Sequence, residues 1–284
     1  ATAFSVPALG ALIPELVPED VLIPGNALRG LSRQFASTAG PILSGILVSL
    51  GTPATAFAFD AATFFVSAAL VAATIPRPLG GRTRTSVLSE IRGGFAFVFS
   101  VQWLWVTIFG FAVVNMASIA ATIVALPILV ATVIGGGAAA YGLVVASTGI
   151  GQAIGAVLLS QFRIRRAGLA MYASTIVSGV ALFGYGLIPS LPGAIAASLV
   201  LGISYAWFGI LWQSALQKHV QRELLGRVTS VDWFGGTLLA PVAPVIAAFV
   251  IQSAGAPMLF IAAGVVVIAF ALGGLLSPSV RALE

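Results

Sequence analysis

Four long apolar blocks, almost free of charge, dominate the chain. They run over residues 34–76, 93–162, 167–217 and 233–280, and the one charged residue inside them is Asp60. An α-helix needs about 20 apolar residues to cross a bilayer. Each block therefore has room for two spans joined by a turn.

Each block also carries a glycine or proline cluster near its middle, where such a turn is expected. The clusters read "LGTPAT" (50–55), "VIGGGAAA" (133–140), "IPSLPG" (188–193) and "QSAGAP" (252–257). The pattern predicts four helical hairpins that follow a partial span over residues 1–14. The predicted spans cover 33–50, 55–75, 103–130, 139–160, 168–188, 193–213, 229–251 and 257–277.

Every basic residue lies before, between or after these hairpins, and the four turns carry no charge of either sign. The basic residues are Arg29, Arg33, Arg77, Arg82, Arg84, Arg92, Arg163, Arg165, Arg166, Lys218, Arg222, Arg227 and Arg281. Connections rich in Lys and Arg stay on the cytoplasmic side of a membrane. We therefore expect these connections and the C-terminus to face the cytoplasm.

Composition supports a multi-pass, all-α membrane protein. The 284 residues are 59% hydrophobic and 7% charged, whereas a soluble domain has about 25% charged residues. The net charge of +5 comes from scattered residues, which form no continuous patch for nucleic acid. The opening "ATAFSVPALGALIP" lacks the basic stretch of a signal peptide. We interpret it as the end of a cut membrane span.

The longest polar connection divides the chain. It reads "PRPLGGRTRTSVLSEIRGGFAFVFS", which predicts a loop followed by a short amphipathic helix at the cytoplasmic interface. We therefore expect a first bundle part over 1–75, a linker over 76–102 and a six-span bundle over 103–284.

Several stretches carry a resemblance to a known family. They are "ALIPELVPEDVLIPGNALRGLSRQFASTAGPILSGILV", "AFAFDAATFFVSA", "VALPILV", "YGLVVASTGIGQAIGAVLLSQFRIRR" and "RELLGRVTS". Through them, nearly the whole chain resembles the major facilitator superfamily, in the branch of enterobactin exporters and macrolide efflux proteins. The resemblance implies a bundle of twelve spans in two halves. This chain would hold part of span 4, spans 5 and 6, and the complete C-terminal half of spans 7–12.

The resemblance also implies a function. It is that of a secondary active transporter that exports a small amphipathic molecule, drug or siderophore-like, by alternating access, with protons as the coupling ion. The expected partners are the bilayer, that substrate and protons, and the expected form is a monomer in the inner cell membrane. A different interpretation is a truncated, non-transporting fragment or a membrane partner subunit.

The residues themselves point away from an enzyme. The sequence has no Gly-x-x-x-x-Gly-Lys loop for ATP. It has no cluster of metal ligands and no nucleophile-base-acid set. We expect no cofactor, no bound metal and no nucleic-acid partner.

Two motifs of the family can be transferred in part. In the exporter motif of the fifth span, Gly40, Pro41 and Gly45 match, while Ser44 stands where a glycine is usual. The loop after the eighth span keeps a basic run without the usual acid. With two later arginines, this run is the predicted cytoplasmic gate or lipid-headgroup site: Arg163, Arg165, Arg166, Arg222 and Arg227.

Two acids are candidates for proton coupling. Asp232, in "TSVDWFGG", is expected about one turn inside its span, and intramembrane acids usually face a cavity or a partner. The alternative is a helix-end acid that stabilises the N-terminal dipole, paired with Arg227. Asp60, in "AFAFDAAT", is the second candidate, with a structural cap as its alternative.

Polar residues on the later spans are candidates for a substrate cavity. Asn115 and Ser118 share one helix face, and the family's cavity-lining spans imply Gln152 as a third polar group. Tyr205 and Trp207 would add aromatic surface for an amphipathic substrate. The alternative for all five is hydrogen bonding and packing between helices.

Two further motifs are interpreted as structural and not functional. "GIGQAIG" (149–155) has the glycine content of a dinucleotide loop, but no strand precedes it. The spacing of Gly151 and Gly155 instead predicts close helix packing. His219 is the only histidine, and we expect it in a solvated loop.

Overall fold

The computed structural model describes residues 51–73, 87–135, 137–162 and 164–283, together with Ser32, Ala36, Gly40, Leu43 and Leu47. These residues form helices joined by short turns, and no strand occurs among them. The chain divides into two compact units, Ala1–Arg84 and Thr85–Glu284. The division falls within the connection expected over residues 76–102.

In the first unit, helix α3 (Pro53–Ala73) is largely apolar, with Asp60 as its one charged residue, and is long enough to cross a membrane. It confirms the span predicted over 55–75. Gly40 has a helical backbone, is exposed, and has open space where a side chain would stand. Its motif partners Pro41 and Gly45 lie outside the described residues.

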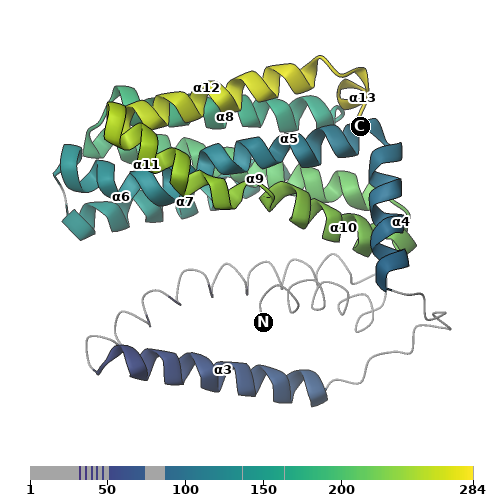
Figure 1. Ribbon diagram of the computed structural model, residues 1–284, viewed down its shortest axis with the longest axis horizontal. Helices are drawn as coiled ribbons and strands as arrows, with labels where there is room; N and C mark the ends of the chain where they lie inside the picture. Colours follow the sequence, from purple (N-terminus) through teal and green to yellow (C-terminus); the bar gives the residue numbers. More distant parts are fainter. Residues whose placement is uncertain are drawn as a thin grey trace. The chain divides into compact units, whose positions relative to one another are not determined.

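The second unit is a bundle of long helices whose axes are roughly aligned, with α4 crossing them at one end (Figure 1). Its elements are α4 (Val87–Ser100), α5 (Gln102–Ile119), η2 (Ala120–Ala125), α6 (Leu126–Leu129), η3 (Val130–Ile134), α7 (Gly137–Ser160), α8 (Ala167–Leu187), α9 (Leu191–His219), α10 (Arg222–Thr237), η4 (Ala240–Val242), α11 (Ala243–Ala254), α12 (Ala256–Leu275) and α13 (Pro278–Arg281). Across the described part of the chain, seven helices are long and apolar enough to span a membrane. They confirm the spans predicted between residues 55 and 277.

Helices α7 and α9 approach each other closely because glycines line their contact. A Cβ atom on Gly202 of α9 would overlap the carbonyl oxygen of Thr148 on α7. A Cβ atom on Gly155 of α7 would lie 2.8 Å from the Cα atom of Ile203. Small residues let helix backbones pack tightly in a membrane. The packing predicted from the spacing of Gly151 and Gly155 is therefore confirmed.

Helix α8 lies between α9 and α12 and brings two buried tyrosines into the bundle. The hydroxyl of Tyr172 hydrogen-bonds with Thr107 of α5 at 3.1 Å, and that of Tyr185 with Ser198 of α9. Buried polar groups are costly unless they are hydrogen-bonded. Among the described residues, no fully buried side-chain nitrogen or oxygen lacks a partner. These bonds therefore join α5, α8 and α9 and leave neither tyrosine hydroxyl group buried without a partner.

The span that begins at Gln102 contains a proline and widens around it. Pro127 has no N–H and collides with the preceding turn of a regular α-helix. The π-helical segments η2 and η3 lie on either side of it, and such wider turns absorb the mismatch. The helical stretch therefore continues to Ile134, beyond the expected residue 130, and ends where Gly135 takes a φ of 76°. Glycine favours that left-handed conformation.

Two helix ends differ from the prediction. Helix α9 continues to His219, so this exposed histidine closes a helix beside the ring of Trp103, 5.8 Å away edge-on, and does not lie in a loop. Helix α10 begins at Arg222, so Asp232 lies about three turns inside it. Apolar periodicity marks the membrane core, but a helix can continue through the polar interface, which explains both errors.

Gly202→Ala should destabilise the bundle, because the new methyl group meets backbone atoms of α7 that cannot rotate away. Overpacking of this kind costs about 1–3 kcal/mol. The matched control is Gly209→Ala on the same helix, where nothing lies within 4 Å of the new Cβ. There, helix propensity should raise stability by about 0.5–1 kcal/mol. Thermal unfolding in detergent compares them, and equal melting temperatures would contradict the close contact.

Candidate functional site

Two adjoining recesses lie in the second unit. The first has a volume of about 240 Å³ and the second about 330 Å³. Both include Phe111, Asn115 and Phe208 in their walls. The first adds Thr107, Trp212, Asp232, Trp233, Gly236 and Thr237, and the second adds Val114, Ser118, Ile119, Thr122, Ser174, Thr175, Ser178, Ser204 and Tyr205.

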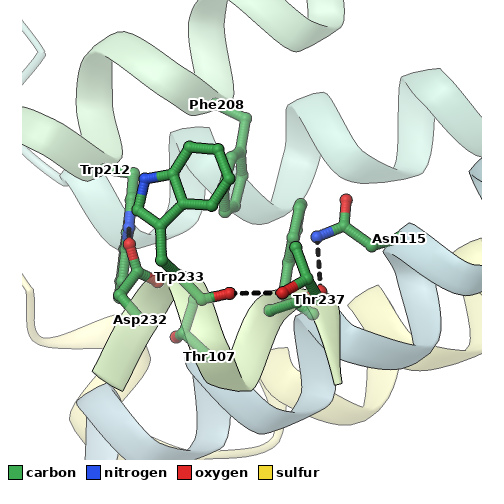
Figure 2. A pocket seen from close by; sticks show the side chains of 9 residues that line it. Thr107, Asn115, Phe208, Trp212, Asp232, Trp233 and Thr237 are labelled. Atoms are coloured by element: carbon green, nitrogen blue, oxygen red, sulfur yellow. Dashed lines mark hydrogen bonds between the residues drawn. The ribbon is translucent and has the colours of Figure 1, made fainter. Parts of the chain in front are cut away.

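A carboxylate held by an indole marks the first recess. The Nε1–H of Trp212 on α9 donates to Oδ2 of Asp232 on α10 at 3.0 Å (Figure 2). Trp212 is buried between Trp103, edge-on at 5.8 Å, and Phe208, stacked at 6.2 Å. Its ring therefore has little freedom. Among the described side chains, it is the one hydrogen-bond donor to this carboxylate.

The position of Asp232 argues against a helix-end role. The macrodipole acts mainly over the first turn of a helix, and α10 begins at Arg222. Asp232 is half-buried and lines the recess. A carboxylate in a membrane-spanning helix is costly and is usually turned toward a partner or an aqueous cavity. Here it has both.

A second hydrogen bond joins α5 to the end of α10. The amide Nδ2 of Asn115 donates to the backbone oxygen of Gly236 at 2.8 Å (Figure 2). The last four carbonyls of a helix have no intrahelical partner, and Gly236 lies in the last turn of α10. Pro241 in η4 lacks the N–H that would bond to the carbonyl of Thr237, and α10 ends at Thr237. Asn115 therefore satisfies a carbonyl that the interrupted span leaves free.

Hydroxyl groups from three helices line the second recess. Helix α8 contributes Ser174, Thr175 and Ser178, and α9 contributes Ser204 and Tyr205. Ser118 of α5 and Thr122 of η2, which continues α5, line the same recess as these five residues. The recess thus carries hydroxyl groups in a largely apolar wall, and it joins the aromatic first recess at Phe111 and Phe208, whose rings stack at 4.0 Å.

The structure brings together three of the five residues predicted for a cavity, namely Asn115, Ser118 and Tyr205. Gln152 and Trp207 line neither recess. Gln152 is half-buried on α7 beside Gly202, and the Nε1–H of Trp207 donates to the carbonyl of Gly155 at 3.0 Å. Both therefore contribute to the contact between α7 and α9.

The remaining predicted residues lie apart from the recesses. Asp60 is exposed on α3, in the first unit. Arg165 and Arg166 are exposed between α7 and α8, and Arg163 lies outside the described residues. Arg222 begins α10, and the backbone of Arg227 packs against Gly94 of α4.

The sequence pattern did not identify Phe111, Phe208 or the hydroxyl groups of α8 as wall residues. Phe111 precedes Asn115 by four residues, and Phe208 precedes Trp212 by four, so each pair shares a helix face. That spacing was a usable signal. The serines and threonines of α8 gave no such signal. The sequence does not show that they line the same recess as residues of α5 and α9.

Comparison with known proteins shows the family. Residues 1–244 match the sequence model of the Major Facilitator Superfamily, which is most of the chain. The chain belongs to this superfamily. It is accordingly a multi-pass membrane protein of a transporter family and not an enzyme.

Curated relatives point to one branch of the superfamily. The chain is 29% identical over 232 residues to the enterobactin exporter EntS of Salmonella choleraesuis (strain SC-B67) and to that of Citrobacter koseri. It is 27% identical over 231 residues to that of Escherichia coli O139:H28. Each match covers 81% of this chain and 55% of the relative. The chain thus spans about half the length of the curated relatives it matches.

Trp212→Phe should lower stability, because it removes the N–H that Asp232 accepts while keeping an aromatic ring beside Trp103 and Phe208. A hydrogen bond to a charged group contributes about 1.5–3 kcal/mol. The matched control is Trp105→Phe, on a partly exposed indole of α5. Thermal unfolding of the purified variants tests this. An equal small loss in both would mean that the indole N–H contributes nothing.

Proposed function

We propose that the protein is an efflux permease of the major facilitator superfamily that exports a small amphipathic molecule by proton-coupled alternating access. The observation that carries the proposal is the carboxylate of Asp232, which lies in a membrane-spanning helix, is held by Trp212 and faces a recess. The similarity to enterobactin exporters supports the direction of transport and suggests a drug or a siderophore-like compound.

The walls of the recesses suit an amphipathic substrate. Phe111, Phe208 and Trp233 offer aromatic faces, on which rings and aliphatic groups pack. Asn115 and the hydroxyl groups of the second recess offer polar contacts. Binding pockets are typically apolar with a few placed polar groups. A molecule with one aromatic and one polar part would contact both recesses at once.

The environment of Asp232 suits a group that gains and loses a proton during transport. Its donor is a neutral indole, so no fixed positive charge holds the carboxylate ionised through that bond. The carboxylate also lines the same recess as the shared residues Asn115 and Phe208, where substrate would bind. Proton uptake and substrate binding would therefore act on the same small volume, as coupled transport requires.

The distribution of basic residues supports one orientation. The connection that holds Arg165 and Arg166, the start of α10 with Arg227, and the C-terminus would face the cytoplasm. There the arginines would contact anionic lipid headgroups or form a cytoplasmic gate. Alternating access by rocking of two bundles around a central site is the usual transporter design.

Coupling is tested with full-length protein in everted membrane vesicles. A panel that includes ethidium, a macrolide and a catecholate siderophore is offered in the presence of a proton gradient. We expect accumulation of at least one compound, and its loss within minutes of adding a protonophore. Accumulation that persists after the gradient has been dissipated would contradict proton coupling.

Asp232→Asn separates the two acidic candidates. It should abolish gradient-driven accumulation, because the amide cannot take up a proton, while it keeps the size of the side chain. Asp60→Asn is the matched control on an exposed position of α3 and should retain accumulation. Membrane abundance of both variants is measured by immunoblot. Full transport by Asp232→Asn would exclude this carboxylate as the coupling group.

A further inference from the structure

Six of the nine side-chain hydroxyl groups that line the two recesses make the same kind of hydrogen bond. Each donates its own proton to a backbone carbonyl three or four residues earlier in its helix, at 2.6–3.0 Å. The six groups are those of Thr122, Ser174, Thr175, Ser178, Ser204 and Thr237. A hydroxyl group has one proton and two lone pairs. Once the proton is used within the helix, the oxygen can only accept from a ligand.

The carboxylate of Asp232 adds a further hydrogen-bond acceptor. Asp232 accepts one N–H from Trp212 through Oδ2, which leaves Oδ1 as a further acceptor. Of the residues described in the two walls, Asp232 is the only one with a formal charge, and that charge is negative. Arginines and lysines, the groups that recognise carboxylates and phosphates, do not occur among these wall residues.

Few donors remain to oppose this pattern. Asn115 uses one amide N–H on Gly236 and keeps one, together with its carbonyl oxygen. Trp233 keeps its indole N–H at an exposed position of the wall. Ser118 and Tyr205 in the second recess and Thr107 in the first each carry a hydroxyl proton as well. Acceptors still outnumber donors, and they lie on α5, η2, α8, α9 and α10.

Burial strengthens the effect that this excess of acceptors has on ligand selectivity. Four of the acceptor hydroxyls, those of Ser174, Thr175, Ser178 and Ser204, are at most 6% exposed. Desolvating a ligand's acceptor group opposite such oxygens would leave both unpaired, which is costly, whereas a donor group would satisfy them. Selectivity between donors and acceptors is accordingly expected to be strong in this recess.

We infer that the two recesses together select ligands by their hydrogen-bond donors: an aromatic ring packs at Phe111 and Phe208, and ammonium or hydroxyl protons point to the hydroxyl oxygens and to Asp232. Ligands that present a carboxylate or a phosphate are rejected. This inference rests on the proposed function, because it takes the recesses as the substrate site, and it assigns the chemical class of the substrate.

Three probes with one dansyl ring test the inference. Dansylcadaverine carries a primary ammonium group, its N,N,N-trimethyl derivative keeps the charge but has no N–H on that group, and dansylglycine carries a carboxylate. Binding to full-length protein in phosphatidylcholine nanodiscs is followed by energy transfer from tryptophan to dansyl. Empty nanodiscs correct for partition into lipid. Neutral lipid avoids concentrating the cations at a charged surface.

We expect the primary ammonium probe to bind about 10-fold more tightly than the trimethyl probe, and the carboxylate probe to bind weakest, since each satisfied acceptor adds to affinity. Equal affinity of the ammonium and trimethyl probes would overturn the inference, because charge alone would then decide binding. Tighter binding of dansylglycine, or no saturable binding of dansylcadaverine, would overturn it as well.

Single hydroxyl deletions locate the effect. Thr175→Val keeps the shape of the side chain and removes one acceptor, and Ser204→Ala removes another. Each should weaken dansylcadaverine binding about 3- to 10-fold and leave the trimethyl probe unchanged. Ser253→Ala is the matched control, because its hydroxyl makes the same bond to the carbonyl of Phe249 at 2.9 Å but lies outside both recesses. An equal effect of Ser253→Ala would overturn the assignment.

These measurements are independent of transport. They use no proton gradient, so a protein that fails to export can still show the donor preference. A protein that exports but prefers the carboxylate probe would contradict the inference and leave the proposed function standing.

Discussion

The structure depends on one constraint, which is that a membrane-spanning backbone must satisfy its polar groups without water. Prolines interrupt two spans of the second unit, at Pro127 and at Pro241. In the first span, π-helical turns widen the helix around the proline. In the second, Asn115 donates to the freed carbonyl of Gly236. The candidate site lies where this second repair is made.

The same requirement determines the chemistry of the recesses. A serine or threonine in an apolar helix donates to the carbonyl of the preceding turn, and the wall residues Thr175 and Ser204 do so. Their protons are thereby used, and their oxygens remain for a ligand. The helices thus remain intact in lipid, and as a consequence the walls of the recesses hold more acceptors than donors.

Close packing holds these groups in place. Glycines such as Gly202 bring α9 against α7, and this contact engages Trp207 and Gly155 on the side of α9 away from the hydroxyl wall. On its other side, α9 presents Phe208 and Trp212 to α5 and α10. One helix therefore connects the structural contact with the candidate site, and movement of α9 would change both.

The sequence by itself determined the spans between residues 55 and 277, their helical character and the close contact at Gly151 and Gly155, because apolar length and residue size are local properties. It also singled out Asp232 and Asn115, since polar residues are rare in such helices. Only the tertiary structure decided that Trp212 holds Asp232, that Trp207 packs between helices, and that the hydroxyls of α8 share a wall with Tyr205. The physical reason is that an apolar span hides its orientation: when every face is hydrophobic, periodicity does not show which face meets a neighbour and which meets lipid.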